Sequence, residues 1–318
     1  MSSPVKVAVV GVGALGQHHA RIYAAMPEAD LVGVVDIREE RAREVGNACR
    51  CQPFGHYLDL IDQVEAISLA VPTLQHATIG REFLERGVHV LVEKPIAADL
   101  PSADALIEAR EKGGTVLLVG HSERFNPAVS AVRPLITRPR FFEAHRMGVF
   151  VRRSLDIDVV LDLMIHDLDL IMHLAGSPIA DIRAVGIPVL TSQVDIANAR
   201  LEFENGCVAN VTSSRVSSEK IRKLRFFQPH DYVSIDFHRQ HVRIYSLVDS
   251  GSGKRILEQE PEIQKEQPLK LELRAFLQTV RQGPGQMSSL SCGAGEGKRA
   301  LDLALTILRL MGRSKDRP

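Results

Sequence analysis

Residues 5–26 read VKVAVVGVGALGQHHARIYAAM: a run of β-branched and small apolar residues, then three glycines, then a helical pattern. The apolar run is continuous rather than alternating, which is typical of a strand buried on both faces. Because Gly11, Gly13 and Gly16 lie between the two patterns, the stretch predicts a strand, a tight turn and a helix in immediate succession. Such a unit is the usual beginning of a parallel sheet covered by helices.

The same succession of strand and helix repeats through the first third of the chain. Four more apolar runs predict buried strands, at residues 29–37, 66–72, 89–95 and 115–121. The stretches between them have helical spacing, and several end at glycine. We therefore expect an α/β protein whose N-terminal domain, residues 1–121, is a doubly wound Rossmann domain.

The pattern changes after about residue 140. Alternating apolar and polar residues predict antiparallel strands, and Asn205-Gly206 between two such runs is a strong hairpin signal. We expect residues 122–318 to form an α+β domain for substrate binding and oligomerisation, with a large open, mainly antiparallel sheet. The C-terminal helix expected at about residues 295–312 could pack back on the first domain.

Composition and charge argue against several classes of protein. The 318 residues contain 45% hydrophobic side chains, and 39 Lys+Arg balance 39 Asp+Glu. This balance gives no indication of a nucleic-acid partner, and no apolar run reaches the roughly 18 residues of a membrane span. The four cysteines form neither a disulfide framework nor a common zinc spacing, so we expect free thiols in a reducing cytoplasm.

The glycine turn has the sequence of a dinucleotide site. The glycines permit close approach of the backbone to a pyrophosphate, and the helix N-terminus supplies N–H donors. Asp36 ends the second strand at the spacing where an acid binds the adenosine ribose hydroxyls, which favours NAD. Arg38 could stack on adenine or make NADP acceptable. The cofactor contacts expected here are Gly11, Gly13, Ala14, Leu15, Gly16, Asp36 and Arg38.

A polar stripe interrupts the apolar segment 158–174, DVVLDLMIHDLDLIMHL. On an α-helix its members fall on one face, at i, i+4, i+7 and i+11. Polar groups on a largely buried helix must be hydrogen-bonded, paired or metal-bound, so the stripe is expected to line a site. Three helical turns are too long for one ion to contact, which argues against a metal. The members of the polar stripe are Asp162, His166, Asp169 and His173.

Three further segments follow at the ends of successive predicted strands: AVPTLQHA (70–77), VEKPIA (92–97) and GHSERFNPAV (120–129). With the glycine turn, they make nearly the whole chain resemble the glucose-fructose oxidoreductase, inositol dehydrogenase and MocA (Gfo/Idh/MocA) family. In that family the Lys of a Glu-Lys-Pro motif and an Asp-x-x-x-His pair surround the reacting carbon. The matching residues are Lys94, Asp162 and His166, with Met164 where the family usually has Gly.

The resemblance implies an NAD(P)-dependent oxidoreductase that acts on a secondary alcohol. His166 would be the general base, because histidine titrates near neutral pH. Lys94 would stabilise the developing alkoxide, and Asp162 would orient His166 or hold a substrate hydroxyl. Further cofactor contacts are expected at Val71, Pro72, His76, Glu93 and Lys94. Substrate contacts are expected at Lys94, Arg124, Asn126, Arg146, Asp162 and His166.

Within the family, GHSERFNPAV and LDLMIHDLDLI (161–171) look most like the nucleotide-sugar branch, the UDP-N-acetylglucosamine 3-dehydrogenases. That branch implies a 3-keto sugar as product and a partner aminotransferase that uses it for lipid A or glycan synthesis. Cations of the second domain would then hold the diphosphate. Besides Arg146, the candidates are Arg152, Arg153, Lys220, Arg222 and Lys223.

Two alternatives stay open. A free cyclitol or sugar dehydrogenase of the inositol dehydrogenase type would use the same catalytic residues on a polyol. A non-catalytic NAD-binding protein is the other, since a fold does not guarantee an activity. The resemblance also implies a homodimer or homotetramer.

Overall fold

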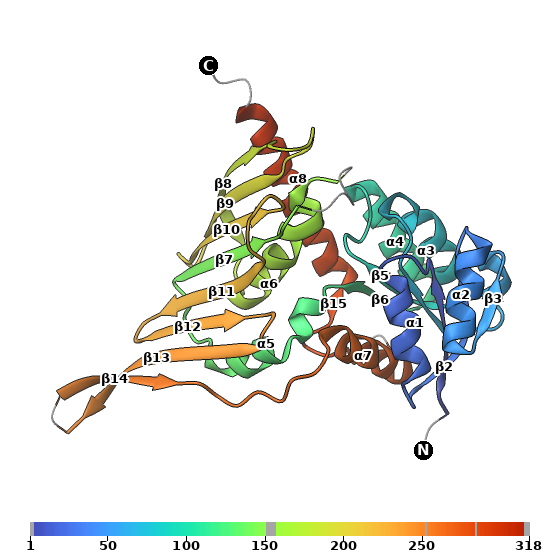
Figure 1. Cartoon of the computed structure of the whole chain (residues 1–318), viewed down its shortest axis with the longest axis horizontal. Helices are drawn as coiled ribbons and strands as arrows, with labels where there is room; N and C mark the ends of the chain where they lie inside the picture. Colours follow the sequence, from blue (N-terminus) through green and yellow to red (C-terminus); the bar gives the residue numbers. More distant parts are fainter. Residues whose placement is uncertain (1–2, 151–156, 252, 284, 315–318) are drawn as a thin grey trace. The chain divides into compact units, whose positions relative to one another are not determined.

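The computed structural model describes residues 3–150, 157–251, 253–283 and 285–314. The chain divides into two compact units, drawn in Figure 1. Unit 1 contains Met1–Phe125 and Gln267–Leu301, and unit 2 contains Asn126–Glu266 and Asp302–Pro318. The sequence predicts one boundary, after residue 121, whereas the chain returns to unit 1 at residue 267. The C-terminal helix, α8 (Ala294–Ser314), is divided between the units at residue 301.

Unit 1 is built on a seven-stranded sheet in the order β15-β6-β5-β4-β1-β2-β3. Strands β1 to β6 pair in parallel, and only β15 is antiparallel to its neighbour β6. This is the doubly wound order that the sequence predicts. The strands are β1 (Val5–Val10), β2 (Ala29–Val35), β3 (Gln52–Phe54), β4 (Ala66–Leu69), β5 (His89–Glu93), β6 (Leu117–Gly120) and β15 (Cys292–Gly293).

Helices follow the strands of unit 1 as the periodicity requires. Asp99 caps α4 by accepting the N–H of Ser102, and Gly114 ends that helix in the left-handed conformation. The helices are α1 (Gly16–Ala24), α2 (Glu39–Cys49), α3 (His76–Leu84), α4 (Leu100–Gly113) and α7 (Pro268–Gln282), with short 3₁₀ helices η1 (Tyr57–Leu60), η2 (Thr73–Gln75) and η3 (Ser122–Phe125).

The core of unit 1 joins the first strand to a helix from the far end of the sequence. Val5, Val7 and Val9 of β1 are at most 2% exposed, and they belong to the same buried cluster as Phe276 and Leu277 of α7. The return of the chain at residue 267 therefore completes this core.

Unit 2 contains an eight-stranded sheet in the order β14-β13-β12-β11-β7-β10-β9-β8. All its pairs are antiparallel except β7 with β10, which confirms the predicted mainly antiparallel sheet. The predicted hairpin joins β9 to β10 through Asn205 and Gly206, whose φ is +76°. The strands are β7 (Phe141–Met147), β8 (Ile179–Ile187), β9 (Ile196–Phe203), β10 (Val208–Ser214), β11 (Ile221–Gln228), β12 (Asp231–Asp236), β13 (His241–Ser250) and β14 (Gly253–Gln259).

The two faces of this sheet differ. One face is buried and contacts the helices of unit 2 (Figure 1). The opposite face has a row of partly buried aromatic side chains across four strands, in ring contact from each to the next: Phe141, Phe227, Tyr232 and Tyr245. The helical segments are α5 (Pro127–Val132), η4 (Arg133–Leu135), the π-helix η5 (Val160–Met164) and α6 (Ile165–Ala175).

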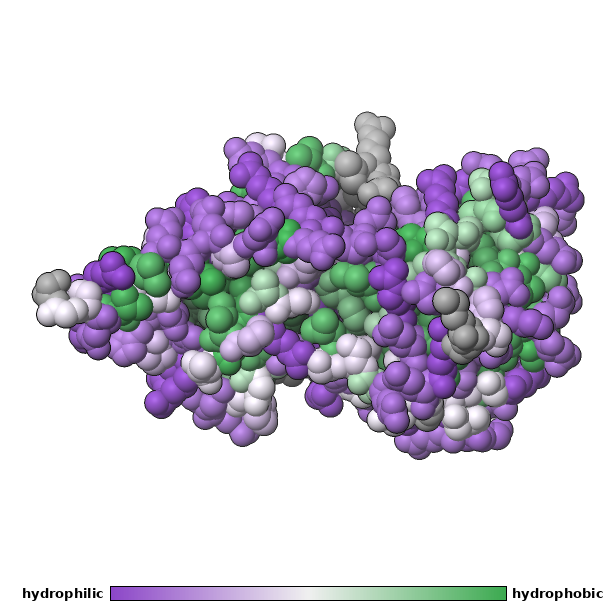
Figure 2. All heavy atoms as spheres, turned by 90° about the horizontal axis from the view of Figure 1, so that it is seen from below, coloured by the Kyte–Doolittle hydropathy of each residue, from purple (hydrophilic) through white to green (hydrophobic). Residues whose placement is uncertain are grey.

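The surface is mixed in polarity. Hydrophilic residues predominate on the face shown in Figure 2, with hydrophobic residues between them. Within the described ranges, no helix has the length and hydropathy needed to cross a membrane. All four cysteines are among the described residues and all are free thiols, as predicted.

Candidate active site

The three glycines after β1 have three different environments. Gly11 has a φ of +85°, and a Cβ there would lie 2.8 Å from the backbone of Ala70. A Cβ on Gly16 would lie 1.8 Å from the carbonyl oxygen of Gly11, so this glycine lets the helix approach the turn. A Cβ on Gly13 would meet no atom within 4 Å. Packing within the protein therefore does not require glycine at position 13. The open side of Gly13 leaves room for another molecule to approach the backbone.

Asp36 lies beside this turn. Its Oδ2 accepts the backbone N–H of Val12 at 3.1 Å, and its Oδ1 accepts that of Arg38 at 3.0 Å. The carboxylate is thus fixed between the glycine turn and the end of β2. The Arg38 side chain is 70% exposed, with its Nε 3.6 Å from Asp36 Oδ1. Ala14 and Leu15 are exposed at the start of α1.

Glu93, beside Lys94, is paired with a histidine of the helix that follows the glycines. The Nε2 of His19, in α1, lies 2.9 Å from Glu93 Oε1, and the two side chains are 1% and 12% exposed. Burial alone would raise the pKa of Glu93, but the His19 contact and the Lys94 charge outweigh it and lower that pKa. The backbone N–H of Lys94 also donates to Glu93 Oε2 at 3.3 Å. The carboxylate therefore joins α1 to the Glu-Lys-Pro motif, whose Lys94–Pro95 peptide bond is cis.

His76 is 1% exposed and lies inside unit 1. Its Nδ1 is 3.0 Å from the carbonyl of Pro95 and its Nε2 is 3.0 Å from that of Val71. Burial lowers the pKa of His76, so the neutral ring donates to one of these two carbonyls. The residue holds the loop after β4 against the Glu-Lys-Pro motif. Of the expected cofactor contacts on that loop, Val71 is partly exposed and Pro72 is exposed, whereas His76 is enclosed.

In unit 2, the polar stripe lies on a helical segment that changes from π to α geometry. The segment begins with the π-helix η5, which contains Asp162, and continues as α6 from Ile165. A π turn has more residues than an α turn. The α-helical spacing assumed for the polar stripe is therefore wrong at Asp162, which lies in the π turn. Asp162, His166 and His173 are partly exposed, and Asp169 is buried.

Three residues that we expect to contact the substrate also make polar contacts within their own units. Arg146 donates from Nε and Nη2 to the two carboxylate oxygens of Asp167 in α6, at 2.8 and 2.9 Å, and this pair is buried. Arg124 binds Glu296 at 3.0 Å and is 2% exposed. Asn126 caps α5 and donates to the carbonyl of Phe237 at 3.1 Å. These contacts give the three side chains a structural role within their own units, and substrate binding by them stays a prediction.

Two of the other cations proposed for a diphosphate, Arg222 and Lys223, lie on β11. Arg152 and Arg153 lie outside the described residues. On β11, Arg222 is paired with Arg146 and Lys223 with His145 of β7, so the two point to opposite faces of the sheet. Arg222 and Lys223 therefore could not both face a ligand on one side of the sheet, and phosphate binding by these cations stays a prediction.

Two residues that hold the candidate site residues in place were not identified from the sequence. Asp167 sits between His166 and Asp169, yet it is the buried acid that binds Arg146. His19 occurs three residues after Gly16, where it reads as an ordinary helical residue. Their roles depend on partners that are distant in the sequence, at separations of 21 and 74 residues.

Comparisons with known proteins agree with this geometry. Residues 5–121 match a family model described as an oxidoreductase family with an NAD-binding Rossmann fold, and residues 103–228 match one described as the GFO/IDH/MocA C-terminal domain. The chain is 38% identical, over 95% of its length and 96% of the relative's, to UDP-N-acetylglucosamine 3-dehydrogenase of Acidithiobacillus ferrooxidans. The chain belongs to the Gfo/Idh/MocA family. It is thus an oxidoreductase of an NAD-binding family, as the resemblance implied.

Other comparisons extend the family likeness. A solved structure of the Acidithiobacillus ferrooxidans UDP-N-acetylglucosamine 3-dehydrogenase superposes with a TM-score of 0.89 at 37% identity, covering 96% of this chain and 97% of that one. The scyllo-inositol 2-dehydrogenase (NAD(+)) of Bacillus subtilis is more distant, at 28% identity over 89% of this chain and 88% of its own.

Proposed function

We propose that the protein is an NAD-dependent dehydrogenase that oxidises a secondary hydroxyl of a nucleotide sugar, with the 3-hydroxyl of UDP-N-acetylglucosamine as the specific assignment. The observation that carries this proposal is the 38% identity, over nearly the full length of both chains, to an enzyme named for that reaction. The inositol dehydrogenase alternative has less support, because the identity to such an enzyme over 89% of this chain is 28%.

The residues of unit 1 fit NAD. The open side of Gly13 admits a pyrophosphate, and the fixed carboxylate of Asp36 can accept hydrogen bonds from ribose hydroxyls while repelling the 2′-phosphate of NADP. When bound, NAD supplies the hydride acceptor. Asp36→Ala should therefore reduce the preference for NAD over NADP, measured as the ratio of the two dissociation constants. Asp30→Ala, at the other end of β2, is the matched control and should leave the ratio unchanged.

The protein's own contribution to the reaction is proton transfer and charge stabilisation. We assign His166 as the base that takes the proton of the reacting hydroxyl, because loss of hydride from carbon requires the oxygen to lose its proton. Lys94 lowers the free energy of the developing alkoxide by its positive charge. Asp162, in the preceding turn of the helix, orients His166 or holds a neighbouring hydroxyl.

The nucleotide would contribute by binding at a distance from the reacting carbon. Binding energy from the UDP moiety can hold the hexose in a reactive position, so free N-acetylglucosamine should be poor in turnover as well as in affinity. At neutral pH the equilibrium favours the alcohol and NAD over the ketone and NADH. This supports a partner aminotransferase that removes the ketone.

We also propose that the protein acts in the cytoplasm as a homodimer or homotetramer. The four free thiols are consistent with a reducing compartment. The row of Phe141, Phe227, Tyr232 and Tyr245 on the open face of the unit 2 sheet supports self-association, because aromatic side chains are enriched in protein interfaces.

Substitution of the assigned catalytic residues tests the mechanism. His166→Ala and Lys94→Ala should each reduce kcat by about a hundredfold or more, while NADH still binds the His166 variant. His173→Ala, seven residues further along the same segment, is the matched control and should retain wild-type turnover. Full activity in His166→Ala would contradict the assignment of His166 as the general base. Loss of activity with a chelator, restored by zinc or iron, would favour a metal mechanism instead.

A further inference from the structure

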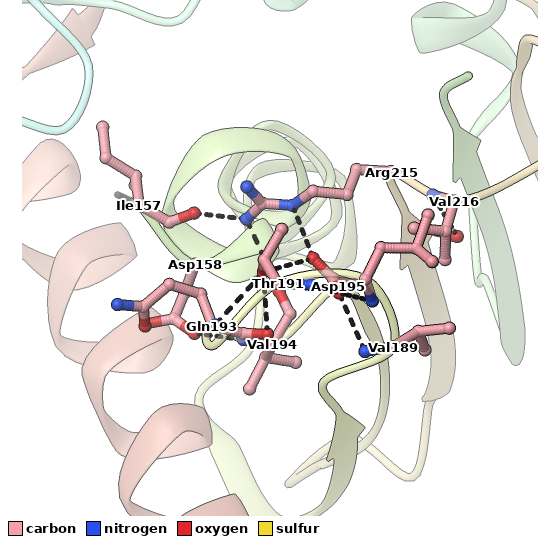
Figure 3. A network of polar contacts seen from close by, with 11 residues as sticks. Ile157, Asp158, Val189, Thr191, Gln193, Val194, Asp195, Arg215 and Val216 are labelled. Carbon is pink, nitrogen blue, oxygen red and sulfur yellow. Dashed lines mark hydrogen bonds and ion pairs between the residues drawn. The ribbon is translucent and has the colours of Figure 1, made fainter. Parts of the chain in front are cut away.

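A buried polar network connects three segments of unit 2: the β8–β9 loop, the residue that follows β10, and the residues that precede η5 (Figure 3). Asp195 and Arg215 lie at its centre, 0% and 8% exposed. Removing two charges from water costs free energy, and close pairing with further hydrogen bonds is needed to offset that cost. The partners of the two side chains show which part of the molecule this pair holds in place.

Asp195 organises its own loop. Its Oδ2 accepts the backbone N–H groups of Val189, Leu190 and Thr191 at 2.8, 2.6 and 2.8 Å, and its Oδ1 accepts the Thr191 hydroxyl at 2.7 Å. Burial alone would raise the pKa of Asp195, but these hydrogen bonds lower it to about 2. The residue is therefore a permanent anion at neutral pH, fixed relative to the loop.

Arg215 extends from this anion to the start of the helical segment that carries Asp162 and His166. Its Nε lies 3.6 Å from Asp195 Oδ1, and its backbone N–H donates to the carbonyl of Asp195 at 2.9 Å. At the other end, Nη2 donates to the carbonyl of Ile157 and, at 3.4 Å, to that of Val194. Figure 3 shows the guanidinium group between Ile157 and Asp195.

The β8–β9 loop binds the next two residues as well. The backbone N–H of Val194 donates to Asp158 Oδ1 at 3.0 Å, and its carbonyl accepts the N–H of Val159 at 3.1 Å. Three consecutive residues, 157 to 159, are thus hydrogen-bonded to groups outside the helix. Val159 is the N-cap and has no side-chain cap of its own, so these outside contacts define where the helix begins. The backbone carbonyl of Asp158 then accepts the N–H of Asp162 at 3.0 Å.

We propose that Arg215, fixed by Asp195, is a positioning residue for Asp162 and His166. This inference rests on the proposed function, in which those two residues act on the substrate hydroxyl. Asp162 is four residues beyond Asp158 and His166 is eight, so movement of residues 157–159 is transmitted along one short helical segment. A displacement of about 1 Å at a reacting group can reduce the rate by about a hundredfold.

Steady-state kinetics of Arg215→Lys and Asp195→Asn test the role. We expect kcat to fall by about tenfold or more, with the dissociation constant of NADH within about twofold of wild type, because the expected cofactor residues belong to unit 1. Guanidinium ion, added below denaturing concentration, should restore part of the kcat lost in Arg215→Ala. The matched control is Gln228→Ala. Gln228 is also 8% exposed, and its partners are Leu135, Thr137, Arg138 and Asp231, which lie outside residues 157–175.

Hydrogen exchange measured by mass spectrometry separates this inference from the proposed function, because it needs no substrate. Arg215→Lys should accelerate exchange in residues 157–166 and leave the peptides of unit 1 unchanged, and Gln228→Ala should not have this effect. If His166→Ala keeps full activity, the proposed function fails, and the exchange data still decide whether Arg215 orders the segment. A kcat within twofold of wild type in both Arg215→Lys and Asp195→Asn, or an equal loss of kcat in Gln228→Ala, would overturn the inference.

Discussion

At the scale of single residues, the three glycines of the turn show how one motif combines folding and binding. The sequence predicts a dinucleotide site from their spacing, but it does not say which glycine serves packing. The structure shows Gly11 in a left-handed backbone conformation and Gly16 in a close helix contact, and it shows an open side at Gly13, where we propose that the cofactor approaches. That distinction could not be derived from the sequence, because it depends on Ala70 and on the path of the backbone in three dimensions.

Alanine substitutions separate the two roles. Gly13→Ala should leave the free energy of unfolding almost unchanged, because its Cβ would meet no protein atom, yet it should weaken NAD binding by about tenfold or more. Gly16→Ala should lower the free energy of unfolding by about 1–3 kcal/mol, the usual cost of overpacking, since its Cβ would overlap the Gly11 carbonyl. Denaturant titration and NADH fluorescence measure the two quantities. Equal destabilisation by both variants would contradict this assignment.

At the scale of secondary-structure elements, long-range polar pairs set positions that periodicity does not. The sequence correctly places Asp162 and His166 on a largely apolar helical segment, and it identifies Glu93 and Lys94 at the end of a strand. It does not predict the π turn of η5 or the contact between His19 and Glu93. Both depend on tertiary contacts, and local pattern contains no information about them.

The His19–Glu93 pair should make stability depend on pH. Because the folded protein lowers the pKa of Glu93, the carboxylate stabilises the fold above its ordinary pKa of about 4.5, and this contribution disappears as pH falls through the lowered value. The difference in unfolding free energy between wild type and Glu93→Gln should therefore be larger at about pH 7 than at about pH 4. Glu108→Gln, an exposed change on α4, controls for the loss of a charge at neutral pH. A difference that grows on acidification would contradict the role of this pair.

At the scale of the whole molecule, the division into two units was only partly predictable. Strand and helix patterns predict two domains and the character of each sheet. They do not predict that α7, which follows the second sheet in the sequence, completes the core of unit 1. The amphipathic pattern of a helix does not specify which domain the helix covers.

The contribution of α7 can be measured through its one aromatic side chain, Phe276. Phe276 is 0% exposed in the core that contains β1. Phe276→Ala should lower the free energy of unfolding by about 3–5 kcal/mol, and it should weaken NAD binding because the same core supports the glycine turn. Ile256→Ala, at a residue that is 73% exposed, should change stability by no more than about 0.5 kcal/mol. A small effect of the Phe276 change would mean that α7 is not part of this core.

The proposed dehydrogenase activity is tested most directly by the rate of NADH formation with UDP-N-acetylglucosamine and NAD, coupled to an aminotransferase and an amino donor that remove the ketone. Myo-inositol, glucose, free N-acetylglucosamine and UDP-N-acetylglucosaminuronic acid are the comparison substrates. We expect UDP-N-acetylglucosamine to give the highest kcat/KM. The His166→Ala variant should form NADH at no more than about one hundredth of the wild-type rate. Faster turnover of a free polyol or of the uronic acid would contradict the substrate assignment, and the absence of NADH formation with every alcohol would contradict the dehydrogenase activity itself.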